Sequence, residues 1–397
     1  MLFANPNPAH CQPLDPADAA ILDRAAADDV ERYLAYRPDH APTPLRTLPA
    51  LAAACGVAAI HVKDESGRFG LGSFKALGGA YAVVRLVLEE ASRRFGRPVG
   101  YEAIAAPDVR AVARTMTVAC ATDGNHGRSV AQGAQLIGAR CAIFVHAGVS
   151  DARVAAIARF GAEMIRVDGT YDDSVTEATR VAAARGWLIV SDTSWAGYER
   201  IPGLVMQGYT AMMREAVEAL REPPSHVFMQ AGVGGLAAAA AGYLALHYGA
   251  DRPTFVVVEP DRAACLYETA RAGHLVKIRH GAPTVMAMLE CYEPSLIAWR
   301  VLSRATDAFM TVGEDDAVAM MNRLARPTGN DPAIVAGESG GAGLAGLARI
   351  AGDAKARTAI GLGADARVFA INTEGATDPV LYRTLTGLDP ASVVKES

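Results

Sequence analysis

The sequence predicts an α/β protein with two lobes, each built on an open and mostly parallel β-sheet. The chain has 397 residues, which exceeds the length at which one hydrophobic core usually divides into two. From about residue 117 onward, short apolar runs alternate with longer helical patterns, as is typical of parallel sheets covered by helices. With 51% hydrophobic and 20% charged residues, the composition is that of an ordinary soluble globular protein.

The first part of the chain is predicted to contain a helix, a strand and a second helix. Residues 15–36 have a helical pattern, and "AAIHVKDES" (58–66) reads as a strand that runs into a loop. From Ser73 onward, apolar residues recur at positions 74, 77, 81, 84 and 88, which places them on one face of an amphipathic helix. Ser73 is the residue type expected at the N-cap of this helix.

Beyond residue 116 the predicted elements alternate regularly. The predicted strands are 117–122, 141–147, 163–169, 187–193, 226–230 and 254–260. The predicted helices between them are 127–139, 151–162, 172–186, 201–220 and 234–249. Open parallel sheets bind ligands beyond the carboxyl ends of their strands, so we expect the chemistry in the loops that follow strands.

Composition and motifs argue against several classes of protein. The net charge of −5 is not segregated, and no basic stripe indicates a nucleic-acid partner. The longest apolar stretch, "GLAAAAAGYLAL", is too short to span a bilayer, so we expect no membrane contact. Six scattered cysteines without a C-x-x-C motif favour a reducing cytoplasm and indicate no metal site. The N-terminus lacks the pattern of a signal peptide, which also favours a cytoplasmic location.

The first loop of interest, "KDESGRFGLGSFKALGGAYAV" (63–83), places Lys75 at the start of the second predicted helix. Lys75 lies off the apolar stripe, and Gly78, Gly79 and Ala82 follow it, so we expect a flat patch with room for a planar ligand. The positive end of the helix dipole and burial both favour a neutral amine, which is the nucleophile that a Schiff base requires. The alternative is an exposed lysine near a helix start.

The second loop is "ATDGNHGRSVA" (121–131), in which a Gly-Asn-His-Gly turn connects a strand to a helix. Backbone N–H groups at such a helix start can hold a carboxylate or a phosphate. Asn125 offers a side-chain amide to a ring oxygen, and Asp123 places a carboxylate at the same edge. A polar turn with ordinary capping is an equally good explanation of this loop alone.

The third loop is "QAGVGGLAAA" (230–239), where a strand runs through glycines 232, 234 and 235 into a helix. Glycines allow the backbone to approach a phosphate closely. The same residues fit the G-x-G-x-x-A pattern of a dinucleotide site, with Glu259 placed where a ribose-binding acid would follow. An NAD-dependent oxidoreductase and a non-enzymatic ligand-binding protein therefore remain alternatives at this point.

The three loops together favour pyridoxal 5'-phosphate (PLP) as the cofactor. Its aldehyde suits Lys75, its ring oxygen suits Asn125, and its phosphate suits the glycine loop. An NAD site would account for the glycine loop alone and would leave Lys75 and the Gly-Asn-His-Gly turn without a role.

Several segments resemble a known enzyme family. "SFK", "GNHG" and "GVGG" in this order are similar to the fold-type-II PLP enzymes. More specifically, "SDTSWAGYERIPGLVMQGY", "VVEPDRAACLY", "GNDPAIVAGESGGAGL" and "INTEGATDP" resemble the diaminopropionate ammonia-lyase family, and such segments run from about residue 60 to residue 380. The resemblance implies an inter-lobe cleft that holds the cofactor.

The resemblance also implies roles for individual residues in catalysis. Lys75 would hold the cofactor and act as a base on one face of the substrate. Asp123 stands where many relatives have a serine, and it would place a carboxylate near the opposite face. Asp192, in "SDTSW", would be a second acidic residue in the pocket. A helix cap or turn residue is the alternative for Asp192.

The cofactor contacts implied by the resemblance come from four segments. The residues are Lys75 with its neighbour Phe74, Asn125 at the ring oxygen, Gly232, Val233, Gly234 and Gly235 at the phosphate, and Thr373 at the pyridine nitrogen. An ordinary strand-end hydroxyl is the alternative for Thr373. The sequence departs from the family pattern at Asn372, where a serine is expected, and at Tyr292, where glycine is usual and where the pocket entrance would change.

The resemblance implies the α,β-elimination of 2,3-diaminopropionate to pyruvate and two molecules of ammonia. A serine, threonine or hydroxyaspartate dehydratase of the same fold is the competing enzyme. We expect a large lobe formed by residues 1–89 and 189–397 and a small α/β lobe formed by residues 90–188. The resemblance further implies a homodimer whose substrate is a small amino acid.

Overall fold

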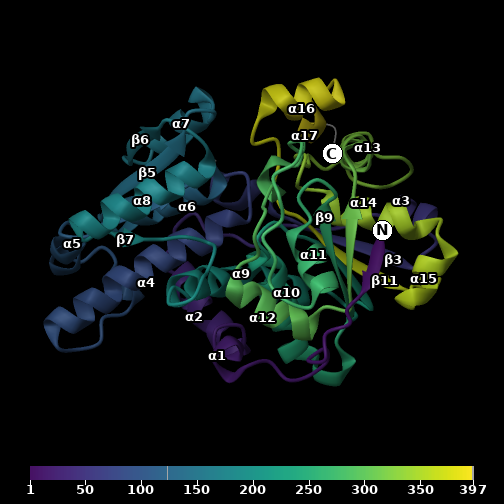
Figure 1. Cartoon of the computed structure of the whole chain (residues 1–397), viewed down its shortest axis with the longest axis horizontal. Coiled ribbons are helices and arrows are strands. Elements are labelled where there is room, and N and C mark those ends of the chain that lie inside the picture. Colours follow the sequence, from purple (N-terminus) through teal and green to yellow (C-terminus); the bar gives the residue numbers. More distant parts are fainter. Residues whose placement is uncertain (123, 396–397) are drawn as a thin grey trace.

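The computed structural model describes residues 1–122 and 124–395, and it contains two separate β-sheets. Figure 1 shows the two sheets on opposite sides of the molecule, each with its own helices. All but two of the strand pairings are parallel, as the sequence predicts. The two antiparallel pairings lie at the edges of the larger sheet.

The larger sheet has seven strands in the order β1-β10-β9-β8-β11-β3-β2. In that order the strands are Leu2–Ala4, Ala308–Val312, Thr254–Pro260, His226–Gln230, Arg367–Asn372, Ala59–Asp64 and Leu45–Thr47. Strands β1 and β2 are the antiparallel edges, and they pair with β10 and β3. Alternate residues of a central strand enter different hydrophobic cores: Phe255 and Val257 face one, and Val256 and Val258 face the other. Burial of both faces explains the continuous apolar run of β9.

The smaller sheet has four parallel strands in the order β6-β5-β4-β7. These strands are Glu163–Val167, Arg140–His146, Thr117–Ala121 and Leu188–Ile189. The strand predicted at 187–193 is only two residues long, and the rest of that segment is a loop that includes Asp192.

Seventeen α-helices connect and cover the strands of the described residues. They are α1 Pro16–Ala19, α2 Arg24–Leu34, α3 Pro49–Cys55, α4 Lys75–Phe95, α5 Pro107–Ala113, α6 Asn125–Ile137, α7 Asp151–Ala158, α8 Tyr171–Arg185, α9 Arg200–Ala219, α10 Gly235–Tyr248, α11 Cys265–Ala272, α12 Leu296–Ala305, α13 Glu314–Ala325, α14 Ala342–Ala351, α15 Ala354–Ala359, α16 Pro379–Thr386 and α17 Pro390–Lys395. Within residues 1–122 and 124–395, none of these helices combines the length and apolarity that a membrane span requires.

Two local predictions for the N-terminal part were wrong. The helix predicted at 15–36 is divided into α1 and α2, because Asp23 caps a new helix by accepting a hydrogen bond from the Ala26 N–H. Ser73 does not cap α4, since this helix begins at Lys75 with Phe74 at the N-cap position and no side-chain hydrogen bond there.

Helix α4 is held between α9 and α6 by close backbone contacts at glycines. A Cβ atom at Gly78 would lie 2.6 Å from the Val205 carbonyl oxygen and 2.6 Å from the Tyr209 ring. A Cβ atom at Gly79 would lie 2.8 Å from the Ser129 hydroxyl oxygen. The expectation that these glycines leave room for a planar ligand was therefore wrong, because neighbouring helices occupy the space. Their function is to fix α4, and with it Lys75.

The same α4 helix crosses the boundary that the sequence analysis places between residues 89 and 90. The helix packs against α6, which follows a strand of the smaller sheet, and against α9, which precedes a strand of the larger sheet. Figure 1 shows α4 running below the smaller sheet toward the centre of the molecule. Lys75 is at the N-terminal end of this shared helix.

We predict that Gly78→Ala destabilises the protein, because its Cβ atom would collide with backbone as well as with a ring. Overpacking of this kind typically costs about 1–3 kcal/mol, and it outweighs the gain of about 1 kcal/mol that alanine brings to a helix. The measurement is the midpoint of urea unfolding. Gly352→Ala is the matched control, because a Cβ atom there meets nothing within 4 Å; an equal shift for both variants would contradict the packing argument.

Candidate functional site

A continuous set of contacts connects the predicted site residues of the described structure. Lys75 pairs with Asp192, and the backbone of Asp192 lies beside Gly235 of the glycine loop. On the other side, the Phe74 N–H donates to the Thr373 carbonyl oxygen at 3.0 Å. The predicted loops after different strands therefore come together around the start of α4.

The Lys75 ammonium forms an ion pair with the Asp192 carboxylate. The two side chains are 21% and 18% exposed, so they are largely but not completely removed from water. Burial alone would lower the pKa of Lys75, but the carboxylate of Asp192 outweighs it, and the net pKa lies well above the ordinary value. Burial opposes the ionisation of Asp192, and the charge of Lys75 favours it. The net pKa of this carboxyl is well below its usual range.

This ion pair corrects the prediction that Lys75 carries a neutral amine. The prediction rested on burial and on the helix dipole, both of which do oppose the charge. A carboxylate in direct contact, in a site of reduced dielectric, contributes more than the dipole at one helix end. The contact with Asp192 therefore favours the protonated form of Lys75.

Two aromatic residues next to the ion pair were missed by the sequence analysis. The Tyr209 hydroxyl is buried and close enough for Lys75 and Asp192 to influence its pKa, which burial raises above the usual value. The Tyr209 ring also contacts Phe74, with ring centroids 4.9 Å apart. The other residue is His126, whose Nδ1 lies 4.0 Å from the Asp192 carboxylate.

His126 presents an unprotonated nitrogen to the acidic side chain. Its Nε2 lies 2.7 Å from the Val190 carbonyl oxygen, which can only accept, so Nε2 carries the proton of the neutral ring. Burial lowers the pKa of His126 below the ordinary value, although Asp192 acts in the opposite direction. In the sequence, only its place in the Gly-Asn-His-Gly turn indicated that His126 belongs to the site.

The loop that carries Asp192 is fixed by a pair of serines. Ser194 and Ser295 share a hydrogen bond between their hydroxyl oxygens at 2.7 Å, and both side chains are buried. The Ser194 N–H donates to the Ser295 hydroxyl, and the Ile297 N–H donates to the Ser194 hydroxyl. Asp192 is thereby attached to the start of α12.

The glycine loop has the conformation that its sequence predicts. Gly234 has a φ of +99°, which favours glycine, and α10 begins at the next residue. A Cβ atom at Gly232 would lie 2.8 Å from the Cys291 sulfur, so this position accepts no larger residue without a shift. The first N–H groups of α10 have no partner within their own helix, which makes them available to an anion.

The dinucleotide explanation of the glycine loop is wrong, because Glu259 is fully buried. Its two carboxyl oxygens accept hydrogen bonds from the N–H groups of Leu266 and Tyr267 at 2.8 and 2.6 Å. Glu259 therefore caps the first turn of α11 and is not exposed to a ribose.

Asn125 lies at the first position of α6, and its amide Nδ2 donates to Glu374 Oε2 at 2.8 Å. Both residues are buried. Burial and the neighbouring Glu338 carboxyl raise the pKa of Glu374 above the ordinary value. Neither glutamate was singled out by the sequence analysis, since nothing in a local pattern connects residues so far apart in the chain.

Thr373 follows β11 directly and is 3% exposed. Its hydroxyl oxygen accepts a hydrogen bond from Gln230 Nε2 at 3.0 Å, so the hydroxyl proton remains to be donated elsewhere. The neighbouring Asn372 donates instead to Asp64 Oδ1 at 2.9 Å and to the Val335 carbonyl oxygen. Asn372 thus belongs to the framework of the larger sheet.

The composition of this region fits a polar, planar cofactor with a phosphate group. Several buried side-chain atoms here find no hydrogen-bond partner among the described residues, among them His126 Nδ1, Gln230 Oε1 and Glu338 Oε1. Buried polar groups are normally paired, so such a concentration marks a place suited to a polar ligand. The Lys75 side chain, the Asn125 amide and the N-terminus of α10 lie in the same region.

Two further predictions concern residues at the edge of this region. The Tyr292 hydroxyl donates to Glu290 Oε1 at 2.7 Å, and its ring lies 3.8 Å from the His280 ring, measured between centroids. Tyr292 therefore packs within its own loop. Asp123, the second predicted acid, lies outside the described residues.

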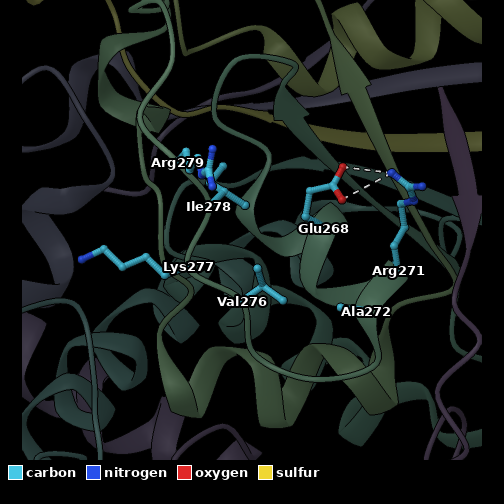
Figure 2. A pocket seen from close by; sticks show the side chains of 7 residues that line it. All are labelled: Glu268, Arg271, Ala272, Val276, Lys277, Ile278 and Arg279. Atoms are coloured by element: carbon cyan, nitrogen blue, oxygen red, sulfur yellow. Dashed lines mark hydrogen bonds and ion pairs between the residues drawn. The ribbon is translucent and has the colours of Figure 1, made fainter.

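A shallow hollow elsewhere on the surface is separate from these residues. It has a volume of about 570 Å³ and lies between α11 and residues 276–279, and Figure 2 shows the Glu268–Arg271 ion pair on one side of it. None of the predicted site residues lines this hollow.

Comparison with known proteins identifies the family. The family model described as pyridoxal-phosphate dependent enzyme matches residues 36–374. The diaminopropionate ammonia-lyase of Escherichia coli K12 is 41% identical over 360 residues, covering 89% of this chain and 88% of that protein. The enzyme of the same name from Salmonella typhimurium is 35% identical, covering 93% of this chain and 94% of that protein.

The fold agrees with this similarity. The crystal structure of Escherichia coli diaminopropionate ammonia-lyase in complex with an aminoacrylate-PLP azomethine reaction intermediate superposes with a TM-score of 0.87 at 36% identity, covering 97% of this chain and 96% of that chain. With the fold-type-II architecture, the lysine at the start of α4 and a family match over most of its length, the chain belongs to the pyridoxal-phosphate dependent enzymes.

Proposed function

We propose that this protein catalyses the PLP-dependent α,β-elimination of 2,3-diaminopropionate, which yields pyruvate and two molecules of ammonia. The observation that carries the proposal is the contact between the Lys75 ammonium and the Asp192 carboxylate. It places an acidic group beside the amine that holds the cofactor. The similarity to diaminopropionate ammonia-lyases over 89% of the chain supports the same reaction.

Residues from four segments would hold the cofactor. Lys75 would bind it covalently, with Phe74 beside it, and Gly232 to Gly235 with the start of α10 would bind its phosphate. Asn125 would donate to the ring oxygen, and Thr373 has a hydroxyl proton to donate to the pyridine nitrogen. When bound, PLP supplies the electron sink that makes the α-proton of an amino acid removable.

The acidic residues would bind the substrate and move its protons. Lys75 would accept the α-proton in its neutral form, and Asp192 would then need another cationic partner. The β-ammonium of diaminopropionate can take that position, whereas the hydroxyl of serine cannot carry the charge. Asp123 is assigned from the sequence alone as the base for the opposite enantiomer.

The organisation of the active protein is also part of the proposal. We assign residues 1–89 and 189–397 to a large lobe and residues 90–188 to a small lobe, with the cofactor between them and α4 shared. Six scattered cysteines without a C-x-x-C motif support a cytoplasmic location. A homodimer is proposed from the resemblance to the family, and size-exclusion chromatography with light scattering measures it.

We expect the purified protein to be yellow, with an absorption band at about 410–420 nm from PLP bound to lysine. Borohydride should bleach the band and leave a label that peptide mapping places on Lys75. Lys75→Ala should lose turnover and the band, while circular dichroism shows an intact fold. The control is Lys355→Ala, an exposed lysine that should keep both. A colourless protein that takes up no PLP would contradict the proposed function.

The second expectation concerns the choice of substrate. Asp192→Asn should lower kcat/KM for diaminopropionate by about 10–30-fold, because an ion pair in a partly desolvated site is worth roughly 1.4–2 kcal/mol. The value for serine should change about threefold or less, and hydroxyaspartate should be the poorest substrate of the wild type. Pyruvate formation at matched substrate concentrations measures this, with the exposed Asp251→Asn as control. If serine is the better wild-type substrate, the protein is a dehydratase.

The third expectation concerns the two enantiomers of diaminopropionate. Asp123→Asn keeps the size of the side chain and removes its capacity to accept a proton. A general base typically contributes about 10²–10⁴-fold, so we expect a loss of at least about 10²-fold for one enantiomer and a much smaller loss for the other. Separate initial rates with the D and L forms measure this. Equal losses would assign Asp123 to substrate orientation instead of proton transfer.

A further inference from the structure

Glu374 lies where the larger sheet meets the first turn of α6. It follows Thr373 at the end of β11 and is 2% exposed. One carboxyl oxygen, Oε2, accepts a hydrogen bond from Asn125 Nδ2 at 2.8 Å, and this contact joins residues 249 positions apart in the chain. The same carboxyl is therefore next to the amide that the cofactor would contact.

The backbone of Glu374 is held independently of its side chain. Its carbonyl oxygen accepts from the Gly337 N–H at 3.0 Å, and its backbone forms an isolated bridge with Ser73. The Gly375 N–H donates to the Gly72 carbonyl oxygen. These bonds do not involve the carboxyl group, so the backbone can stay in place when the side chain is changed.

An asparagine amide requires an external partner to define its orientation. Rotation by 180° exchanges the Nδ2 and Oδ1 atoms, and only the Nδ2 side can donate. Asn125 has two N–H bonds, and Glu374 accepts one of them. The bond to Glu374 fixes the amide plane and thereby the direction of the second N–H. The reversed amide would place Asn125 Oδ1 against Glu374 Oε2.

The environment of Glu374 is compatible with this function at neutral pH. Burial and Glu338 raise its pKa, while the hydrogen bonds from Asn125 and Ser339 and the charge of Arg153 act in the opposite direction. The carbonyl oxygen of a protonated carboxyl accepts an N–H as a carboxylate oxygen does. A glutamine, which has one carbonyl oxygen at the same distance along the side chain, can therefore replace it.

We propose that Glu374 is a positioning residue for the cofactor: its carboxyl accepts one N–H of Asn125 and thereby holds the other N–H ready for the ring oxygen of PLP. The inference rests on the proposed function, because it requires PLP to bind at Lys75. In this role Glu374 acts through Asn125 and does not touch the reacting atoms. The two side chains are also predicted to act as one unit.

The test compares two substitutions of similar length that differ in the acceptor. Glu374→Met removes the acceptor, and Glu374→Gln retains one. Each is made alone and together with Asn125→Ala, and PLP is titrated into the apoprotein while the absorption band near 410–420 nm and the dissociation constant are recorded. We expect Glu374→Met to weaken PLP binding about tenfold and to displace the band, since one buried hydrogen bond is lost. Glu374→Gln should stay within about twofold of the wild type.

The double variant distinguishes positioning from a general structural effect. In the Asn125→Ala background, Glu374→Met should weaken PLP binding by less than about twofold, because the amide that it orients is absent. An unchanged tenfold loss in that background, or equal losses for Met and Gln, would overturn the inference. Glu102→Met, at an exposed glutamate outside this region, is the control for the loss of a glutamate, and it should bind PLP as the wild type does.

Protein folding and the proposed function are checked in the same experiment. Thermal unfolding of the apoproteins identifies any variant that is misfolded, and the Gln variant keeps the comparison valid if Met is unstable. A wild-type protein that binds no PLP at Lys75 would refute the proposed function itself. A wild-type protein that binds PLP, with no coupling between Glu374 and Asn125, would refute only the positioning role.

Discussion

The contact between Lys75 and Asp192 is the interaction on which the site depends. Burial and the positive end of the α4 dipole oppose the lysine charge, and the Asp192 carboxylate favours it. A helix terminus contributes about 0.3–1 kcal/mol at an exposed position. Two unit charges in contact at an effective dielectric of about 20 interact by about 4 kcal/mol. Asp192 therefore decides the charge of Lys75, and any step that removes the lysine charge must leave Asp192 with a new partner or with water.

The position of this ion pair is determined by packing on both sides. Lys75 is carried by α4, whose glycines 78 and 79 meet the backbone of α9 and the side chain of Ser129 at distances that leave no room for a methyl group. Asp192 is carried by a loop that Ser194 attaches to the start of α12. Neither charged residue relies on the other for its place, so the pair can separate during a reaction while the backbone remains fixed.

The sequence predicts those parts of the site that lie within one continuous segment. Lys75, Asn125 and the glycine loop are found at strand–helix junctions, and β8 and β9 coincide with the predicted apolar runs. Partners far apart in the chain could not be found this way, because the Lys75–Asp192 contact spans 117 positions and the Asn125–Glu374 contact spans 249.

Other errors of the sequence analysis have the same origin. A local pattern shows that Gly78 has no side chain, but it does not show whether a ligand or a helix uses the space. The resemblance to a family assigned Asp192 and Thr373 to the cofactor site. It did not show that they contact Lys75 and Gln230, respectively. The edge strands β1 and β2 have three residues each, too few to show an alternating pattern.

The Asn125–Glu374 and Lys75–Asp192 contacts would respond differently to a cofactor bound as proposed. Asn125 has two N–H bonds, so it can keep its bond to Glu374 while the other N–H is used. Lys75 has a single nitrogen, and it cannot both bond to the cofactor and remain a full ammonium partner of Asp192. Under the proposed function, the first contact would therefore persist through the reaction as a fixed support, whereas the second would be exchanged. Under this proposal, position 374 needs only a buried acceptor for Asn125, whereas position 192 needs an acid that stays ionised.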